Sequence, residues 1–339
     1  MTVSFEGSVL PESLKRLIKE YNIGGVLLFR SHCPSLAHLQ KLIAELKSLR
    51  TDPPLMIAID HEGGRVHRLP KPFTHFPPMR FVKTEEQAEA VGEAMGRELG
   101  AVGIDIDFAP VLDVATNPLN KVIGDRAFDL SASSVAEMGV AFIRGLQKTG
   151  VAACGKHFPG HGDTDDDSHF VLPALSHNRK RLEQLEWVPF RAAIEEGVAG
   201  LMTAHILYNI LDPGVMATLS VKIVRDILRE DLQFPGVIFS DDLGMGAVAA
   251  FATIEEAAVL ALNAGCDNLL LGRHEEKQRT TLERLHRAVE SGEIPATVIE
   301  AAYRRVLHLK ERFVIPKKEI PLSVIGCADH RTLARSLII

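Results

Sequence analysis

The stretch ACGKHFP, residues 153–159, joins a short apolar run of β-strand composition to polar side chains at its carboxyl end. Similar runs recur along the chain, and segments with apolar residues at helical spacing separate them. The eight runs are residues 3–5, 25–29, 55–60, 104–110, 153–159, 200–206, 236–242 and 268–272. Strands that alternate with helices predict a parallel sheet, and eight is the number that closes into a (β/α)8 TIM barrel.

The segments between the runs are typical of amphipathic helices. Residues 36–49, for example, place leucine or isoleucine at positions 36, 39, 42, 43, 46 and 49. The other predicted helices cover residues 11–21, 85–99, 133–148, 179–196, 220–231, 253–264, 276–291 and 295–313. An open doubly wound sheet would give the same alternation, but no glycine-rich dinucleotide turn follows the first run. We therefore expect a single-domain α/β barrel over residues 1–313, with a C-terminal tail, residues 314–339, packed on it.

Composition limits the classes of partner. The chain has 46% apolar and 24% charged residues, and its 38 basic against 44 acidic residues give a net charge of −6. Without a long basic run or a long apolar one, neither a nucleic acid nor a membrane is expected as partner. Four widely spaced cysteines do not suggest disulfides or a zinc site. We expect a cytoplasmic, monomeric protein that acts on a small molecule.

Polar residues gather at the carboxyl ends of the predicted strands, the face where a barrel carries its active site. They are Asp60, Lys156, His157, His205, Asp241 and Asp242. The longest stretches without periodicity, residues 61–81 and 159–173, leave from the same face. Loops of such length are usually functional, so chemistry is expected there.

The densest group of polar residues is KHFPGHGDTDDDSH, residues 156–169. A solvated acidic loop is one interpretation, but Lys156 and His157 belong to the apolar strand, where desolvation of a charge is usually accepted only at a binding site. A metal site with His157, His161 and His169 as ligands is another alternative. Their spacing matches neither a helical zinc motif nor a calcium loop.

Two further motifs place carboxylates at strand ends. In SDDLGM, residues 240–245, adjacent side chains point to opposite sides of a strand, so one carboxylate is expected to face the barrel axis and the other to support it. In DHEGGRVHR, residues 60–68, a carboxylate and two arginines suit a polyhydroxylated or anionic ligand. Glu62 and Arg65 in this motif are also able to pair with each other.

These motifs carry a resemblance. KHFPGHGDT followed by DSH, together with DHEGGRV, IGDRAF, MTAH and SDDLGM, resembles family 3 glycoside hydrolases. Within that family it is similar to the single-domain bacterial β-N-acetylhexosaminidases of cell-wall recycling. The similarity covers about residues 20–275 with the motifs in the family's order. One departure is His61, where the family most often has glutamine.

The resemblance implies roles for individual residues, without a metal or cofactor. Asp241 matches the catalytic nucleophile, His169 the acid/base and Asp167 its orienting partner. The residues implied to hold sugar hydroxyls are Asp60, Arg68, Arg126, Lys156 and His157. A histidine suits proton transfer in both directions, because its unperturbed pKa of about 6.5 lies near working pH.

The implied activity is that of a retaining exo-β-N-acetylglucosaminidase. It would hydrolyse terminal GlcNAc from muropeptide fragments such as GlcNAc-1,6-anhydroMurNAc, through a glycosyl-aspartate intermediate. A phosphorylase on the same site is an alternative, because an imidazole repels an incoming phosphate less than a carboxylate does. A metal-dependent barrel hydrolase and a sugar-binding barrel without catalysis are further alternatives.

Overall fold

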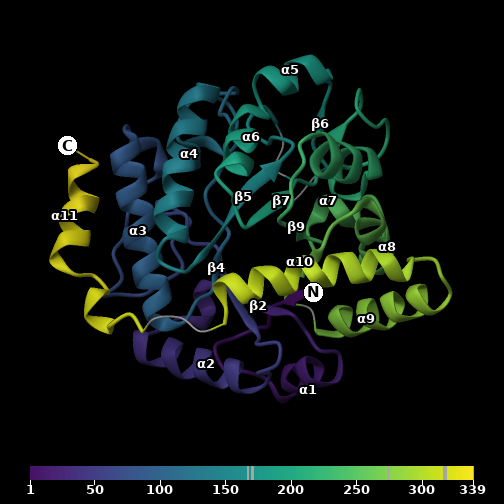
Figure 1. Cartoon of the computed structure of the whole chain (residues 1–339), viewed down its shortest axis with the longest axis horizontal. Coiled ribbons are helices and arrows are strands. Elements are labelled where there is room, and N and C mark those ends of the chain that lie inside the picture. Colours follow the sequence, from purple (N-terminus) through teal and green to yellow (C-terminus); the bar gives the residue numbers. More distant parts are fainter. Residues whose placement is uncertain (166–167, 169–171, 274, 316–318, 339) are drawn as a thin grey trace.

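Eight parallel strands form a closed barrel in the computed structural model, which describes residues 1–165, 168, 172–273, 275–315 and 319–338 (Figure 1). Each barrel strand overlaps one of the predicted runs, which confirms the TIM barrel. In order around the barrel they are β1 (Thr2–Val3), β2 (Gly25–Leu28), β3 (Met56–Ile59), β4 (Ile106–Asp107), β5 (Ala152–Phe158), β7 (Gly200–Thr203), β9 (Val237–Asp242) and β10 (Asn268–Leu271). Two short strands, β6 (Ala174–Leu175) and β8 (Leu207–Tyr208), pair with each other outside the barrel.

Helices surround the strands, as expected for alternating elements. They are α1 (Glu12–Glu20), α2 (Leu36–Ser48), α3 (Glu85–Val102), α4 (Ala132–Gln147), α5 (Arg179–Gln184), α6 (Val188–Glu195), α7 (Gly246–Ala249), α8 (Ile254–Ala264), α9 (Glu275–Glu290), α10 (Ala296–Phe313) and α11 (Ala328–Ser336). A π-type helical segment covers Lys222–Asp231. Side chains that favour helix starts cap several of them. Thr84, for instance, accepts a hydrogen bond from the Gln87 backbone N–H at 3.2 Å.

The single helix predicted for residues 179–196 is wrong, because the chain there forms α5 and α6 with a break at Leu185. Pro189 is the physical reason. Its ring removes a backbone donor and would clash with the carbonyl group four residues earlier, which belongs to Leu185. The helix therefore ends before that residue and restarts with the proline in its first turn.

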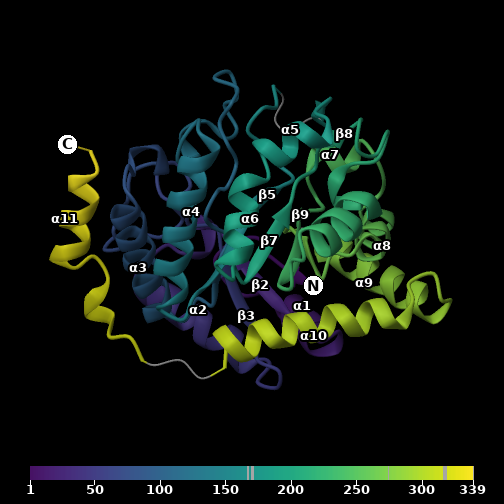
Figure 2. The ribbon, with the colours of Figure 1, turned by 45° about the horizontal axis from the view of Figure 1, so that its top comes forward.

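The barrel interior is filled with apolar side chains. They include Leu27, Met56, Phe108, Cys154 and Phe239, all buried. Leu309 and Phe313 of α10 belong to the same cluster, since α10 runs across the barrel at the amino ends of the strands (Figure 2). Helix α10 therefore covers the barrel at the amino ends of the strands, while the pocket described below lies at their carboxyl ends.

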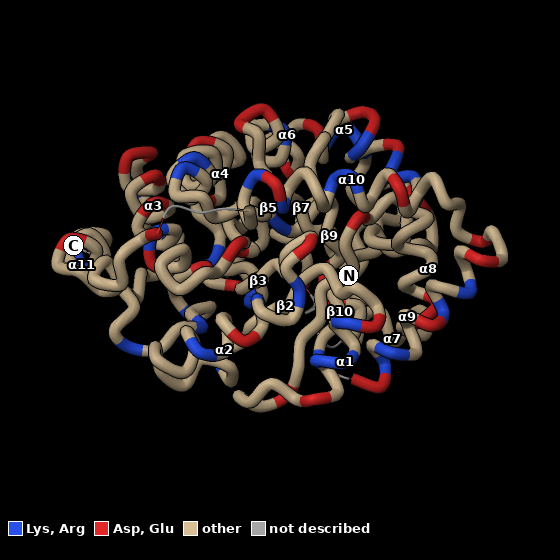
Figure 3. The backbone as a smooth tube through the Cα atoms, turned by 60° about the horizontal axis from the view of Figure 1, so that its bottom comes forward, with Lys and Arg blue, Asp and Glu red and all other residues tan. Residues whose placement is uncertain are grey.

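The outer surface mixes charges of both signs. Figure 3 shows acidic and basic residues interspersed along the outer helices. None of the described helices is long and apolar enough to cross a bilayer.

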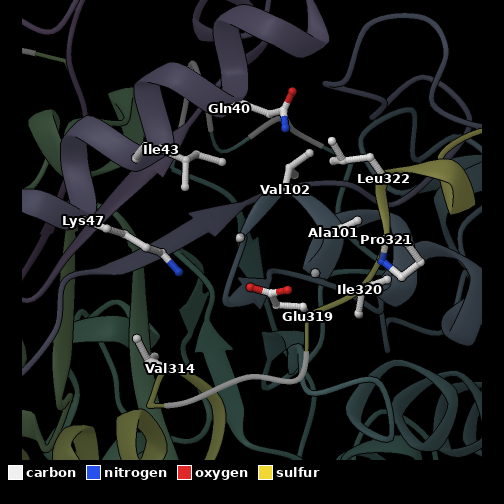
Figure 4. Close-up of a pocket in the computed structure, with 13 residues that line it drawn as sticks. Gln40, Ile43, Lys47, Ala101, Val102, Val314, Glu319, Ile320, Pro321 and Leu322 are labelled. Atoms are coloured by element: carbon white, nitrogen blue, oxygen red, sulfur yellow. The ribbon is translucent and has the colours of Figure 1, made fainter.

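The C-terminal segment lies beside the barrel, and α11 packs along α3 (Figure 1). A cavity of about 690 Å³ lies between α2, α3 and residues 319–322, and Figure 4 shows the side chains that line it. Its charged lining residues are Lys47 and Glu319, and Lys47 is already paired with buried Asp105 at 2.9 Å. We assign no chemistry to this cavity. The division into a barrel of residues 1–313 and a tail of residues 314–339 stays a prediction.

Helices α3 and α4 approach so closely that they tolerate no side chain at the contact. A methyl group on Gly145 would lie 2.1 Å from the carbonyl oxygen of Glu89. We therefore expect Gly145→Ala to lower the free energy of unfolding by about 1–3 kcal/mol, although alanine favours helix by about 1 kcal/mol. Chemical denaturation measures this change.

Gly100→Ala is the matched control, because its methyl group would meet the flexible end of Ile320 rather than backbone. We expect that variant to be as stable as the wild type or up to about 1 kcal/mol more stable, because no backbone clash offsets the helix propensity of alanine. If Gly145→Ala had the same free energy of unfolding as the wild type, α3 and α4 would be able to move apart at this contact without loss of stability.

Candidate active site

A pocket of about 260 Å³ opens at the carboxyl ends of the barrel strands. Asp241, the predicted nucleophile, and all the predicted sugar-binding residues line it: Asp60, Arg68, Arg126, Lys156 and His157. These residues come from the ends of β3, β5 and β9 and from the loops that follow β3 and β4. The barrel therefore brings together side chains that are up to 181 positions apart in the sequence, from Asp60 to Asp241.

Glu62 organises the charged wall of the pocket. Its carboxylate accepts two hydrogen bonds from Arg126, from Nε at 2.7 Å and from Nη2 at 2.8 Å. Lys156 Nζ lies 2.5 Å from Glu62 Oε1 and 2.8 Å from Asp60 Oδ1. Only 3% of the Glu62 side chain is exposed. One buried carboxylate thus fixes two cations that face the pocket.

The pairing of Glu62 with Arg65, considered from the sequence, is wrong. Arg65 is exposed and lies 3.5 Å from Asp125, whereas Glu62 turns into the pocket. The reason is electrostatic, because a buried carboxylate needs buried cations, and Arg126 and Lys156 supply them. Sequence reasoning did not assign Glu62 to the site, although it stands two residues after Asp60.

The groups of this cluster stay charged. Burial alone would raise the pKa of Glu62, but Arg126 and Lys156 outweigh it and hold that pKa well below its usual range. Burial would likewise lower the pKa of Lys156, and Asp60 and Glu62 instead raise it above its ordinary value. The pocket therefore presents fixed ionic hydrogen-bonding groups at neutral pH.

Lys156 and His157 are consecutive in β5, yet both line the pocket. Neighbouring strand residues normally point to opposite faces, but the register of β5 against β7 shifts between Lys156 and Phe158. This irregularity turns both side chains to the same cavity. It was not readable from the apolar pattern of the run.

Asp113 holds His157 in place. His157 Nδ1 lies 2.7 Å from Asp113 Oδ2, and Asp113 Oδ1 accepts hydrogen bonds from the backbone N–H groups of His157, at 3.2 Å, and His161, at 2.6 Å. Burial raises the pKa of Asp113, but the interactions with His157 and His161 and the hydrogen bonds that it accepts together outweigh burial, and the net shift is downward. An ionised Asp113 leaves Nε2 of His157 as the ring nitrogen available to a ligand. Sequence reasoning missed Asp113, which follows the fourth apolar run.

Asp241 and Asp242 end β9 in different environments. Asp241 Oδ1 accepts a hydrogen bond from the Asp242 backbone N–H at 2.8 Å. Burial raises its pKa, but the neighbouring His205, His157 and Lys156, together with the hydrogen bond from the Asp242 N–H, outweigh this, so its pKa lies below the usual value. Asp242 Oδ1 accepts from Gly244 and Gly272 N–H, both at 2.9 Å, and burial raises its pKa. Asp241 is the carboxylate left ionised and free for a substrate.

His205 supports this strand end. Its Nδ1 lies 2.8 Å from the hydroxyl of Thr218, and its Nε2 lies 3.0 Å from the carbonyl oxygen of Asp242. Since both ring nitrogens are occupied and burial lowers its pKa, His205 supports the strand end by its position rather than by binding a ligand.

Arg68 has a donor left for a ligand. Its Nε is buried and has no hydrogen-bond partner among the described residues.

The predicted acid/base His169 and its partner Asp167 lie outside the described residues. Ser168 between them is described and lines the pocket. Its hydroxyl lies 3.1 Å from His161 Nε2, and the Thr164 hydroxyl lies 2.8 Å from His161 Nδ1. Burial lowers the pKa of His161 to about 4. With hydroxyl groups at both nitrogens, His161 is not free to bind a metal in this arrangement.

Comparisons with known proteins agree with this geometry. Residues 6–309 match the model of the glycosyl hydrolase family 3 N terminal domain. A beta-hexosaminidase of Nitrosospira multiformis is 40% identical over 293 residues, covering 84% of this chain and 83% of that protein.

Solved structures are also similar. A family 3 beta-N-acetylglucosaminidase from Paenibacillus superposes with a TM-score of 0.94 at 39% identity, over 99% of this chain and 66% of that chain. NagZ from Neisseria gonorrhoeae, in complex with N-trifluoroacetyl-D-glucosamine, has a TM-score of 0.81 at 33% identity, over 99% and 96% of the two chains.

The Glu62 cluster generates a test. Glu62→Gln keeps the shape of the side chain but removes the charge that compensates Arg126 and Lys156. We expect the free energy of unfolding to fall by about 3 kcal/mol, because one member of a buried ionic cluster is removed. Urea denaturation at neutral pH measures the fall.

Arg65→Ala serves as control for charge removal in the same loop. Its pair with Asp125 is exposed, so we expect a change within about 0.5 kcal/mol. If Glu62→Gln unfolded at the same urea concentration as the wild type, groups other than Glu62 would compensate the charges of Arg126 and Lys156, and the role given to Glu62 would be wrong.

Proposed function

Since this chain belongs to glycosyl hydrolase family 3, as a glycoside hydrolase of the β-N-acetylhexosaminidase type, we propose that it is a retaining exo-β-N-acetylglucosaminidase. It removes terminal, non-reducing β-linked GlcNAc from peptidoglycan fragments such as GlcNAc-1,6-anhydroMurNAc. The observation that carries the mechanism is Asp241, a carboxylate with a lowered pKa at the end of β9, facing a pocket lined with charged hydrogen-bonding groups.

The pocket supports recognition of one terminal sugar. Its volume of about 260 Å³ is below the range of about 300–1,000 Å³ typical of drug-sized ligands. Lys156, Arg126 and Arg68 supply charged donors, and Asp60 supplies acceptors for hydroxyl groups. His157, oriented by Asp113, adds a further ring nitrogen. A small site that is closed at its far end favours release of single sugars from a chain end.

Catalysis in this proposal has two steps. The carboxylate of Asp241 attacks the anomeric carbon while His169, oriented by Asp167, donates a proton to the leaving oxygen, so the glycosidic bond breaks as the glycosyl-aspartate bond forms. Neutral His169 then takes a proton from water, whose oxygen attacks the same carbon and displaces Asp241. Two inversions give net retention. No metal or cofactor takes part in either step.

Peptidoglycan fragments are proposed as the natural substrate on two grounds. The motifs resemble the hexosaminidases of cell-wall recycling, and one similar structure is a NagZ with a glucosamine derivative bound. We further propose that the protein acts as a monomer in the cytoplasm, without a nucleic-acid or membrane partner. The mixed surface charge supports this view of the partners.

The nucleophile is tested on an aryl β-N-acetylglucosaminide, with the matching aryl β-glucoside as specificity control. We expect Asp241→Ala to lower kcat by about four orders of magnitude or more, because the covalent step is lost. Asp226→Ala, on the outer surface, is the matched control and should keep wild-type activity. EDTA should leave the wild type active.

Two results would contradict the proposal. Activity in Asp241→Ala would reject the nucleophile, and loss of wild-type activity with EDTA would return the histidines to a metal site. Mass analysis of the product in phosphate buffer separates hydrolysis from phosphorolysis, since only the latter yields a sugar phosphate.

The acid/base is tested by leaving-group dependence. His169→Ala should slow substrates with poor leaving groups by about 100-fold or more, because their departing oxygen needs a proton. Activated aryl glycosides need little protonation and should lose far less in their glycosylation step, which pre-steady-state kinetics isolates from deglycosylation. Equal losses on both substrate types would make His169 a structural residue.

A further inference from the structure

We propose that Glu98 and His330 are positioning residues, which tie the C-terminal segment to the loop after β3 and so set the affinity of the pocket for its sugar. This loop, residues 60–78, carries Glu62 and Arg68 into the pocket. The inference rests on the proposed function for its effect on catalysis, but the tie itself is a matter of contacts.

Glu98 joins three segments of the chain. It stands on α3 with 3% of its surface exposed. Its carboxylate accepts two hydrogen bonds from Thr74 in the β3 loop, from the backbone N–H at 2.8 Å and from the hydroxyl at 2.7 Å. It also accepts one from Gly326 N–H at 3.0 Å, and its Oε1 lies 2.7 Å from His330 Nδ1. Four contacts thus converge on one carboxylate, three on Oε1 and one on Oε2, which is about the number that such a group accepts.

The C-terminal backbone touches the same loop directly. Gly326 has a φ of +61°, and a methyl group there would lie 2.0 Å from the carbonyl oxygen of Pro72. Only glycine allows this approach. The C-terminal segment therefore contacts the loop at Pro72, two residues before Thr74. His330 is buried nearby, with 8% of its surface exposed.

A continuous set of contacts leads from Thr74 to the pocket. The next residue, His75, has its Nε2 2.9 Å from the carbonyl oxygen of Gly64, and its ring stacks on His67 with centroids 4.3 Å apart. The ring of His67 lies 4.6 Å from that of His61. His61 Nδ1 accepts a hydrogen bond from the backbone N–H of Arg68 at 3.4 Å. Because these residues are in direct contact, a shift of Thr74 is expected to shift the backbone of Arg68 at the pocket.

Besides the Glu62 cluster and a backbone hydrogen bond from Gly64 N–H to the Phe76 carbonyl group at 2.9 Å, little regular structure defines the shape of this loop. Between residues 60 and 78 it contains no helix, and its only regular pairing is the isolated bridge of Gly63 with Val66. Side-chain contacts must therefore hold it. Burial raises the pKa of Glu98, but hydrogen bonds from His330 and Thr74 outweigh it and lower the pKa. The carboxylate that anchors the loop is thus ionised at neutral pH.

The test compares His330→Ala, His330→Gln and Arg331→Ala. Arg331 is exposed on the same helix, so its variant controls for a change in α11. On an aryl β-N-acetylglucosaminide we expect His330→Ala to raise KM about three- to tenfold, as for part of a charge-assisted hydrogen bond, with kcat within about twofold. His330→Gln, whose amide is able to donate to Glu98, should recover part of the affinity. Arg331→Ala should match the wild type.

A second readout does not depend on activity. Amide hydrogen exchange should speed up locally over residues 61–76 in His330→Ala, while the barrel strands stay protected. An inactive wild type would defeat the proposed function but leave this readout intact. Unchanged KM with unchanged exchange would overturn the tie. A uniform rise in exchange over the whole chain, with apparent kcat falling at unchanged KM, would make His330 a stability residue only.

Discussion

The barrel mouth depends on the compensation of charges that are kept away from water. Glu62 is almost fully buried, and so is Lys156, at 2% exposed. A single ion in such a place would cost several kcal/mol, whereas a carboxylate shared by a guanidinium and an ammonium keeps all three ionised. Because Arg126 comes from the β4 loop, Glu62 from the β3 loop and Lys156 from β5, the cluster also fixes three barrel segments relative to one another.

Much of this architecture was predictable from the sequence. The eight apolar runs gave the strands because a parallel strand is buried on both faces and leaves a nearly continuous apolar signature. Polar residues at the ends of those runs, such as Asp60 and Asp241, indicated the face of the site. The resemblance added roles for them, and the structure places the described ones in one pocket.

The remaining features depend on contacts between distant segments, which a local pattern does not contain. The partners of Glu62 are the cations that are buried beside it. Arg65 is exposed and therefore does not pair with Glu62. Asp113 reaches His157 because a register irregularity in β5 turns the His157 side chain toward the cavity. Pro189 was visible in the sequence, but its clash falls on Leu185, four residues away, inside a run that otherwise has helical spacing.

Asp113 has a mechanical consequence. One carboxylate holds both the ring of His157, on the pocket wall, and the backbone of His161, at the base of the loop that leads to His169. A shift of the His161 backbone would remove a donor from Asp113 and so weaken the support of the imidazole that faces the pocket. The orientation of the His157 ring and the position of the His161 backbone are therefore coupled. A change that moves the His161 backbone therefore also changes the support of the His157 ring, so these two parts of the pocket wall are not independent.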